Sequence, residues 1–275
     1  MLLGLMRPSM TGEASAPGQG IDYLGKARQI LQVMSVEERV GQVFLVSFTG
    51  SSALEGSQIL DLVTHKHIGG VILQRDNDNF RGPEDTTATL QQMILDLQTA
   101  NWETNLAANY SRAYTPLFIG IQQEGNLFPG DQILNGMTEL PNEMTIGATW
   151  DTNAAQTVGS ILGSELSAIG INLLLGPSLD ILDLVHTGRV EELGGRTFGG
   201  DPFWVGKMGL AYTRGVHEGS DNRVAVVASH FPGIGSSDRQ PNEEIATVRS
   251  SLEQMKKVEL APYFAVTNTE RDATE

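Results

Sequence analysis

Five short apolar segments, each separated from the next by a segment with helical signals, constrain the fold more than any other feature of the sequence. They are VFLVSF (43–48), GGVIL (69–73), PLFIGI (116–121), INLLLGP (171–177) and VAVVA (224–228). Strands that are buried on both faces have such continuous apolar runs, and strands that alternate with helices form parallel sheets. The pattern therefore predicts an α/β protein built around a parallel sheet.

The segments between these strands carry apolar residues at helical spacing. We expect helices over residues 22–34, 56–65, 86–100, 152–170 and 202–218. Ser35 and Glu38 have the spacing of a capping box and predict a further short helix. Ser250 and Glu253 have the same spacing and predict a last helix that continues at least to Glu259.

Two architectures fit this alternation, a doubly wound sheet and a (β/α)8 TIM-type barrel. The loops after the third, fourth and fifth strands are long and polar, whereas the helix-to-strand turns are tight, as at Gly170-Ile171. Barrel enzymes carry their sites on the loops at the carboxyl ends of the strands, so this asymmetry favours the barrel. A barrel needs eight strands, and the chain has about five to six βα units, so we expect an incomplete barrel with an unpaired, aggregation-prone edge.

The first twenty residues differ in composition from the rest of the chain. Residues 1–20 have a linker-like composition and are expected to be a flexible segment, and residues 21–275 are expected to be the barrel domain. The apolar start is interrupted by Arg7 and Pro8, which makes it too short for a signal peptide or a membrane span. We therefore expect a soluble chain and leave its compartment open.

Charge and cysteine content exclude several classes of function. The chain has 33 acidic and 18 basic residues, a formal net charge of −15, which opposes binding to a phosphate backbone. Neutral substrates such as sugars are compatible with this charge. The absence of cysteine excludes disulfides, thiolate metal sites and a cysteine nucleophile.

Three polar clusters follow predicted strands directly. They are QQEGN (122–126), the loop that contains Asp180, Asp183 and GGRTFGGDP (194–202), and SHFPG (229–233). In a barrel, all three would converge on one mouth. Their shared placement predicts a functional site there.

Each cluster also has a purely structural interpretation. The Gln-Glu pair can be a loop contact or a helix cap, and His230 can be a hydrogen-bonded core histidine. Arg196 can pair with Asp180 or Asp201, or its guanidinium can bind the diols or carboxylates of a substrate.

No motif in the sequence predicts a cofactor or a metal site. The GIG at 233–235 fails as a dinucleotide fingerprint because Asp238 stands where a glycine is needed. His65 and His67 lack an assignable third ligand, and a solvated helix end explains them. The sequence has no G-x-S-x-G nucleophile elbow.

Seven segments follow one another in the sequence: VGQVFLVSF, HIGGVIL, PLFIGIQQEGN, ELSAIGINLLLGPSLDI, GRTFGGDP, SHFPGIG and VELAPYFAV. In this order, from about residue 35 to 267, they resemble the N-terminal barrel domain of glycoside hydrolase family 3, which includes β-N-acetylglucosaminidases and β-glucosidases. The resemblance implies a carbohydrate substrate, no cofactor, and retaining hydrolysis of O-glycosyl bonds.

The resemblance also implies where catalytic groups would stand. The family's aspartate nucleophile follows a seventh strand, which this chain does not contain. The histidine acid/base of one branch, with its supporting aspartate, falls at Asn242 and Gln240, and neither side chain titrates. Glu243 and Glu244 are nearby carboxylates that could substitute, or could simply belong to a solvated loop.

The substrate-binding positions that the resemblance implies are Gln122, Asp180, Arg196, Ser229 and His230. Arg196, His230 and Asp180 match the family, whereas Gln122 replaces an aspartate, Ser229 a lysine and Gly130 an arginine. Two hypotheses follow: the first part of a glycosidase whose nucleophile lies beyond residue 275, or an inactive carbohydrate-binding or structural descendant.

Overall fold

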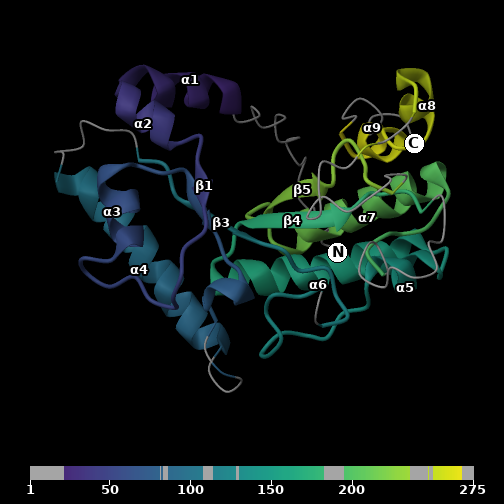
Figure 1. Ribbon diagram of the computed structural model, residues 1–275, viewed down its shortest axis with the longest axis horizontal. Helices are drawn as coiled ribbons and strands as arrows, with labels where there is room; N and C mark the ends of the chain where they lie inside the picture. Colours follow the sequence, from purple (N-terminus) through teal and green to yellow (C-terminus); the bar gives the residue numbers. More distant parts are fainter. Residues whose placement is uncertain are drawn as a thin grey trace, which may run out of the picture.

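The computed structural model describes residues 22–80, 82, 86–107, 114–127, 130–182, 195–235, 247 and 250–267 (Figure 1). Its centre is a five-stranded parallel sheet. The strands are β1 (Leu45–Val46), β2 (Gly70–Ile72), β3 (Phe118–Ile121), β4 (Leu173–Ser178) and β5 (Ala225–Ser229). The predicted N-terminal segment, residues 1–20, lies outside the described residues.

The order of the strands in the sheet identifies the architecture. It is β1-β2-β3-β4-β5, so each strand pairs in parallel with the next one along the chain. A doubly wound sheet reverses its order at a switch point, and this sheet does not. The predicted α/β fold with an incomplete TIM-type barrel is therefore confirmed. Among the described strands, β1 and β5 are edges, and the sheet is not closed.

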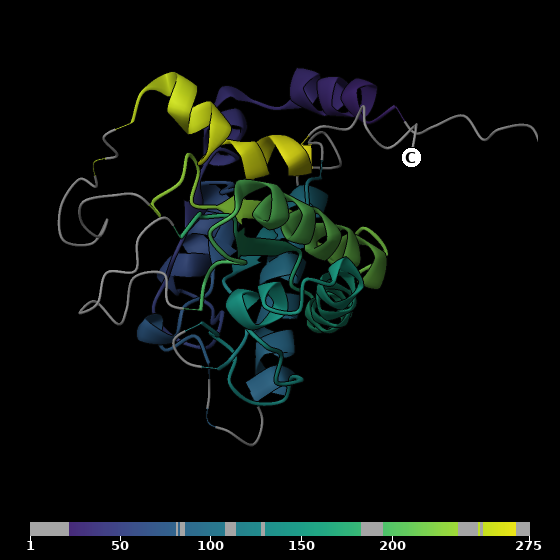
Figure 2. The same ribbon diagram turned by 90° about the vertical axis from the view of Figure 1, so that its right-hand side faces the viewer.

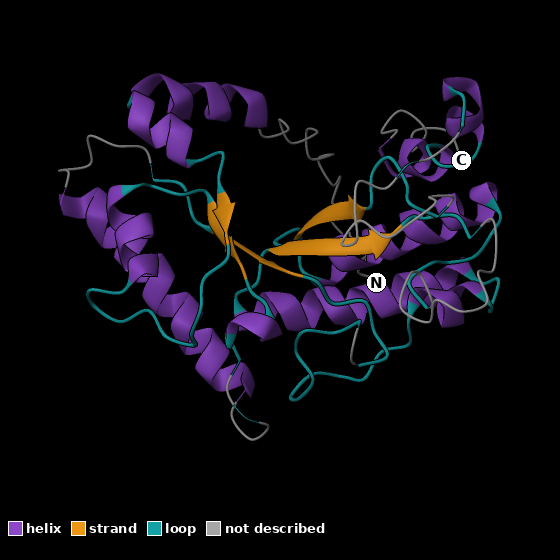
Figure 3. Ribbon diagram, in the orientation of Figure 1, coloured by secondary structure: helices purple, strands orange, loops and turns teal. Residues whose placement is uncertain are grey.

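Helices occupy the connections between the strands (Figure 3). They are α1 (Tyr23–Val33), α2 (Val36–Gly41), α3 (Gln58–His65), α4 (Thr86–Ala107), α5 (Glu143–Gly147), α6 (Thr152–Ile169), α7 (Pro202–Gly219), α8 (Leu252–Lys257) and α9 (Ala261–Thr267), with a 3-10 turn at Arg75–Asn77. None of the described helices is both long and apolar enough to span a bilayer.

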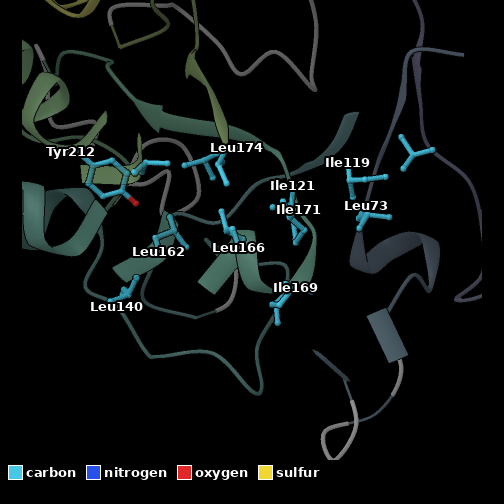
Figure 4. Close-up of a cluster of buried hydrophobic side chains, with 14 of the residues drawn as sticks. Leu73, Ile119, Ile121, Leu140, Leu162, Leu166, Ile169, Ile171, Leu174 and Tyr212 are labelled. Atoms are coloured by element: carbon cyan, nitrogen blue, oxygen red, sulfur yellow. The ribbon is translucent and has the colours of Figure 1, made fainter. Parts of the chain in front are cut away.

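The hydrophobic core lies between these helices and one face of the sheet (Figure 4). Ile119 and Ile121 of β3 and Leu174 of β4 belong to the same buried cluster as Leu166 of α6 and Tyr212 of α7. Successive side chains of a strand point to opposite faces, so the neighbouring residues of these strands face away from the helices.

The other face of the sheet, which a closed barrel would turn inward, is partly open to solvent. Leu45, Phe118 and Val227 keep 41%, 46% and 47% of their surface exposed. Leu45 pairs with Gly70, and Gly70 pairs with Phe118, so Leu45 and Phe118 lie on one row across the sheet. This apolar face is what remaining barrel strands would cover.

Glycines allow α6 and α7 to pack at backbone distance. A Cβ atom at Gly159 or Gly163 of α6 would overlap the carbonyl oxygen of Tyr212 or Val216, respectively. Gly215 of α7 lies equally close to the backbone of α6. Small residues one turn apart permit such close approach, so these glycines set the spacing between the two helices.

Two predicted boundaries were wrong at the C-terminal end. The last helix is capped by Ser251, whose hydroxyl accepts from the amide of Gln254, and not by Ser250 with Glu253. α8 ends at Lys257, before the predicted Glu259, and a separate helix follows. Pro262 prevents one continuous helix through this region, because its ring and missing N–H are incompatible with a helix interior, but it is tolerated in the first turn of α9.

Elsewhere the structure differs from the prediction in length. β1 has two residues where an apolar run of six was expected, and α4 continues to Ala107 instead of ending near residue 100. α5 lies inside the predicted loop 122–150, where the side chain of Asn142 caps its first turn. A proline and several glycines around this turn concealed it in the sequence.

We expect the Gly163→Ala substitution to destabilise the protein. In an exposed helix, alanine would stabilise by about 1 kcal/mol relative to glycine, but here overpacking should reverse the sign and cost about 1–3 kcal/mol. Urea unfolding measures the change, with Ser164→Ala at an exposed position of α6 as the control. A Gly163→Ala variant that is more stable than the parent would contradict the close approach of α6 and α7.

Candidate active site

The three polar clusters meet at the edge of the sheet where the strands end. Gln122 and Glu124 follow β3, Asp180 follows β4, and His230 follows β5. Arg196 comes from the segment between β4 and α7. The arrowheads of β4 and β5 point toward the same side in Figure 3, and Figure 2 looks onto that side. The predicted convergence at one mouth is therefore what the structure contains.

Arg196 and Glu124 form a two-pronged ion pair. The guanidinium Nη2 donates to Glu124 Oε1 at 3.1 Å, and Nε donates to Oε2. The side chain of Glu124 is 1% exposed and that of Arg196 is 26% exposed. Charge-assisted pairs of this geometry are strong and directional. The carboxylate therefore holds the guanidinium in one orientation at the mouth.

Of the two interpretations left open for Arg196, the structural one names Asp180 or Asp201 as its partner, whereas the structure gives Glu124. Asp201 instead caps α7 and accepts from the amides of Phe203 and Trp204. Burial has the largest effect on the pKa of Arg196 and lowers it, whereas contact with Glu124 and, more weakly, the nearby charge of Asp180 raise it.

His230 lies between Asp180 and Arg196. Its Nδ1 is 2.6 Å from Asp180 Oδ2, and its Nε2 is 3.1 Å from Arg196 Nη2. A guanidinium can only donate, so Nε2 accepts and Nδ1 carries the proton that it donates to Asp180. Hydrogen bonds thus connect four side chains, Asp180, His230, Arg196 and Glu124, and we call this set the Arg196 network.

Asp180 anchors one end of the Arg196 network. Its carboxylate accepts from the hydroxyl of Ser178 at 3.0 Å and from the amide of Ile234 at 2.6 Å. Its carbonyl oxygen accepts from the hydroxyl of Thr197 at 2.6 Å. Asp180 is buried, so these bonds replace the water it loses. The carboxylate is therefore fixed behind His230 rather than offered to a substrate.

Glu143, on the first turn of α5, is a buried acid that sequence reasoning missed. Neither side-chain oxygen has a hydrogen-bond partner among the described residues. Burial raises its pKa well above the usual value and nearby Glu124 raises it further, against weaker lowering by backbone amides and Arg196. Its environment therefore favours the neutral form of the carboxyl. Burial also raises the pKa of the Tyr212 hydroxyl on α7.

The structure shows the surroundings of the three residues that depart from the family pattern, Gln122, Ser229 and Gly130. Gln122 donates from Nε2 to Glu124 Oε2 at 3.2 Å. The hydroxyl of Ser229 is buried and has no hydrogen-bond partner among the described residues. At Gly130, an added Cβ would lie 2.5 Å from the carbonyl oxygen of Gly125, so a side chain there requires a shift of the loop.

The candidate proton-transfer positions Gln240, Asn242, Glu243 and Glu244 lie outside the described residues. Within the described part of the chain, no cluster of three or more metal-ligating side chains exists. His65 contacts Asp61 one helical turn away, and both side chains are exposed. The groups that a ligand can reach in the Arg196 network are the donors of Arg196 and the partly exposed ring of His230.

Comparison with known proteins identifies relatives of this chain. The sequence model of the family described as "Glycosyl hydrolase family 3 N terminal domain" matches residues 35–273. A β-hexosaminidase of Neisseria gonorrhoeae is 30% identical over 204 residues, which cover 71% of this chain and 49% of that protein. The chain thus spans about half the length of this curated relative.

Two further relatives agree with this. A β-N-acetylglucosaminidase/β-glucosidase of Cellulomonas fimi is 27% identical over 85% of this chain and 36% of that protein. The solved structure of a glycoside hydrolase family 3 β-N-acetylglucosaminidase from Paenibacillus superimposes with a TM-score of 0.73 at 30% identity. It covers 86% of this chain and 40% of the Paenibacillus chain.

Replacing Glu143 with glutamine should change how stability depends on pH. Above the ordinary carboxyl pKa of 4.5, the unfolded chain loses this proton while the folded protein keeps it. Rising pH therefore lowers the parent's free energy of unfolding until the raised pKa is passed, and glutamine removes this loss. Urea unfolding at pH 5 and pH 8 should show a variant whose advantage grows with pH.

Glu139→Gln is the matched control for this test because Glu139 is an exposed carboxyl close by in the sequence. It should shift stability equally at both pH values. The same pH dependence in Glu143→Gln and the parent would mean that Glu143 is ionised in the folded protein.

Proposed function

This chain belongs to glycosyl hydrolase family 3, whose N-terminal domain it matches, and from this premise we propose that it forms the barrel part of a retaining glycoside hydrolase. The substrates are β-N-acetylglucosaminides or β-glucosides. The observation that carries the proposal is the Arg196 network, in which Glu124, Asp180 and His230 from three neighbouring strand ends hold the guanidinium of Arg196 at one mouth.

In this proposal, Arg196 and His230 bind the sugar. The guanidinium donates to sugar hydroxyls or to an N-acetyl carbonyl, and the imidazole positions the same unit. Glu124 and Asp180 are buried behind them and fix their orientation. Because both supports are in place before a ligand arrives, little side-chain entropy remains to be lost on binding.

The reaction would follow the retaining scheme. A carboxylate attacks the anomeric carbon, the bond to the leaving oxygen breaks, and a general acid protonates that oxygen. Water, deprotonated by the same group, then releases the sugar from the enzyme. In this proposal the nucleophile would come from a segment outside these 275 residues. Glu243 and Glu244, beside Asn242 at the family's acid/base position, are nearby carboxylates that could substitute as the acid/base, which could also come from outside this chain.

A second candidate function is an inactive carbohydrate-binding or structural protein. It is favoured by Gln122 and Ser229, which are uncharged where the family has an aspartate and a lysine. Each lost charge-assisted hydrogen bond is worth about 1.5–3 kcal/mol. A protein of this type would bind its sugar weakly and turn nothing over.

Hydrolysis separates the two functions. The full protein in which this chain occurs should release the chromophore of an aryl N-acetyl-β-glucosaminide or an aryl β-glucoside if it is a glycosidase. Sugar binding without turnover, measured by calorimetry, would support the second function. If neither binding nor turnover occurs, the glycosidase and the carbohydrate-binding protein are both excluded, and only the structural form of the second function is left.

Arg196→Lys tests the binding role. Lysine keeps the positive charge beside buried Glu124, so folding is preserved, but it cannot form the two-pronged contact. We expect affinity for N-acetylglucosamine to fall about tenfold, the equivalent of one weakened charge-assisted hydrogen bond. Arg223→Ala, before β5 at the opposite edge of the sheet, is the control. Unchanged affinity in Arg196→Lys would exclude Arg196 from the sugar site.

A further inference from the structure

A second hollow lies on the same side of the sheet as the Arg196 network. It has a volume of about 250 Å³, and its lining includes Arg75, Asp78, Phe80, Gln132 and Asn135. We call it the Arg75 pocket. Arg75 follows β2 directly, and Gln132 belongs to the loop that follows β3. Both segments leave the carboxyl ends of their strands, which is the edge that carries the candidate active site.

Hydrogen bonds connect the Arg75 pocket to the segment that carries Glu124. The amide of Arg75 donates to Gln132 Oε1 at 2.8 Å, and the amide of Gln132 donates to Gln123 Oε1 at 3.1 Å. Gln123 stands between Gln122 and Glu124 in the chain. One loop therefore presents its first residues to the Arg196 network and its later residues to the Arg75 pocket.

Hydrogen bonds of buried side chains fix the two segments that form the walls of the Arg75 pocket. Asn79 is buried, its side chain accepts from the amide of Gln74 at 2.8 Å, and it donates to the carbonyls of Phe48 and Gly50. On the other wall, Gln123 is buried and its Nε2 donates to the carbonyl of Ile133 at 2.9 Å. A pocket with fixed walls is preformed, which is typical of ligand sites.

The chemistry of the lining fits a neutral, hydroxyl-rich ligand. Arg75 and Asp78 provide one charge of each sign, and neither side chain has a hydrogen bond or an ion pair with another described residue. Gln132 and Asn135 add amide groups, and Phe80 adds an apolar ring surface. Opposed charges disfavour a phosphate or a carboxylate ligand, whereas a sugar ring offers hydroxyls to both charges and C–H groups to the aromatic ring.

We propose that the Arg75 pocket is a second sugar subsite, which holds another unit of an oligosaccharide while the first unit occupies the Arg196 network. This proposal rests on the proposed function, because it assumes that the first site binds a sugar. Two connected subsites confer a preference for oligosaccharides over single sugars, since binding of the second unit becomes intramolecular.

Calorimetry with N-acetylglucosamine and its β-1,4-linked dimer and trimer tests the proposal. We expect the trimer to bind at least tenfold more tightly than the single sugar. The double substitution Arg75→Ala/Asn135→Ala should abolish this gain and leave the affinity for N-acetylglucosamine unchanged. Both residues lie at the surface, so folding should be preserved. Lys66→Ala, before β2 at the opposite edge, is the matched control.

Three results would overturn the proposal, and they are distinguishable. Equal affinity for single sugar and trimer would mean that no second subsite exists. A trimer preference that survives the double substitution would place the second subsite elsewhere. The absence of binding by every sugar would contradict the proposed function itself, whereas the first two results leave it intact.

Discussion

The buried ion pair between Glu124 and Arg196 is the interaction on which the candidate site depends. Glu124 has lost nearly all contact with water, so its charge is tolerable only while the guanidinium is beside it. Removing one partner of such a pair costs about 3–5 kcal/mol. The pair therefore joins the loop after β3 to the segment before α7, and the hydrogen bonds of His230 with Arg196 and Asp180 continue the network to the ends of β5 and β4.

This constraint also explains the state of Glu143. A second buried negative charge beside Glu124 would cost more than one guanidinium and the nearby backbone amides offset. The raised pKa of Glu143 reflects this cost and favours the neutral form of the acid. Burial thus acts differently on two neighbouring glutamates because only one of them has an arginine in contact.

The open sheet does not prevent the site from forming. The network is built from the ends of β3, β4 and β5, which are consecutive neighbours, so its geometry needs no contact from a closing strand. What the open sheet leaves uncovered is the apolar inner face around Leu45, Phe118 and Val227. The described residues therefore form the Arg196 network without the strands that would cover this apolar face.

Local features of the sequence predicted most of the elements. Continuous apolar runs located all five strands, and the Ser35–Glu38 capping box located α2, because both signals act between residues close in the chain. The failures have a common physical reason. Pro262 separates α8 from a further helix, and Asn142 starts α5 within an apparent loop, since a cap or a proline can outweigh periodicity over one turn.

The sequence by itself determined the fold class, the strand positions and the convergence of three polar clusters, because strand period, helix signals and parallel connection follow from neighbouring residues. The tertiary structure decided which charges meet. Arg196 pairs with a glutamate 72 residues earlier rather than with the nearer Asp180 or Asp201. Burial then raised the pKa of Glu143. A partner is chosen by distance in space and by the loss of water, and neither quantity is a property of a local stretch of sequence.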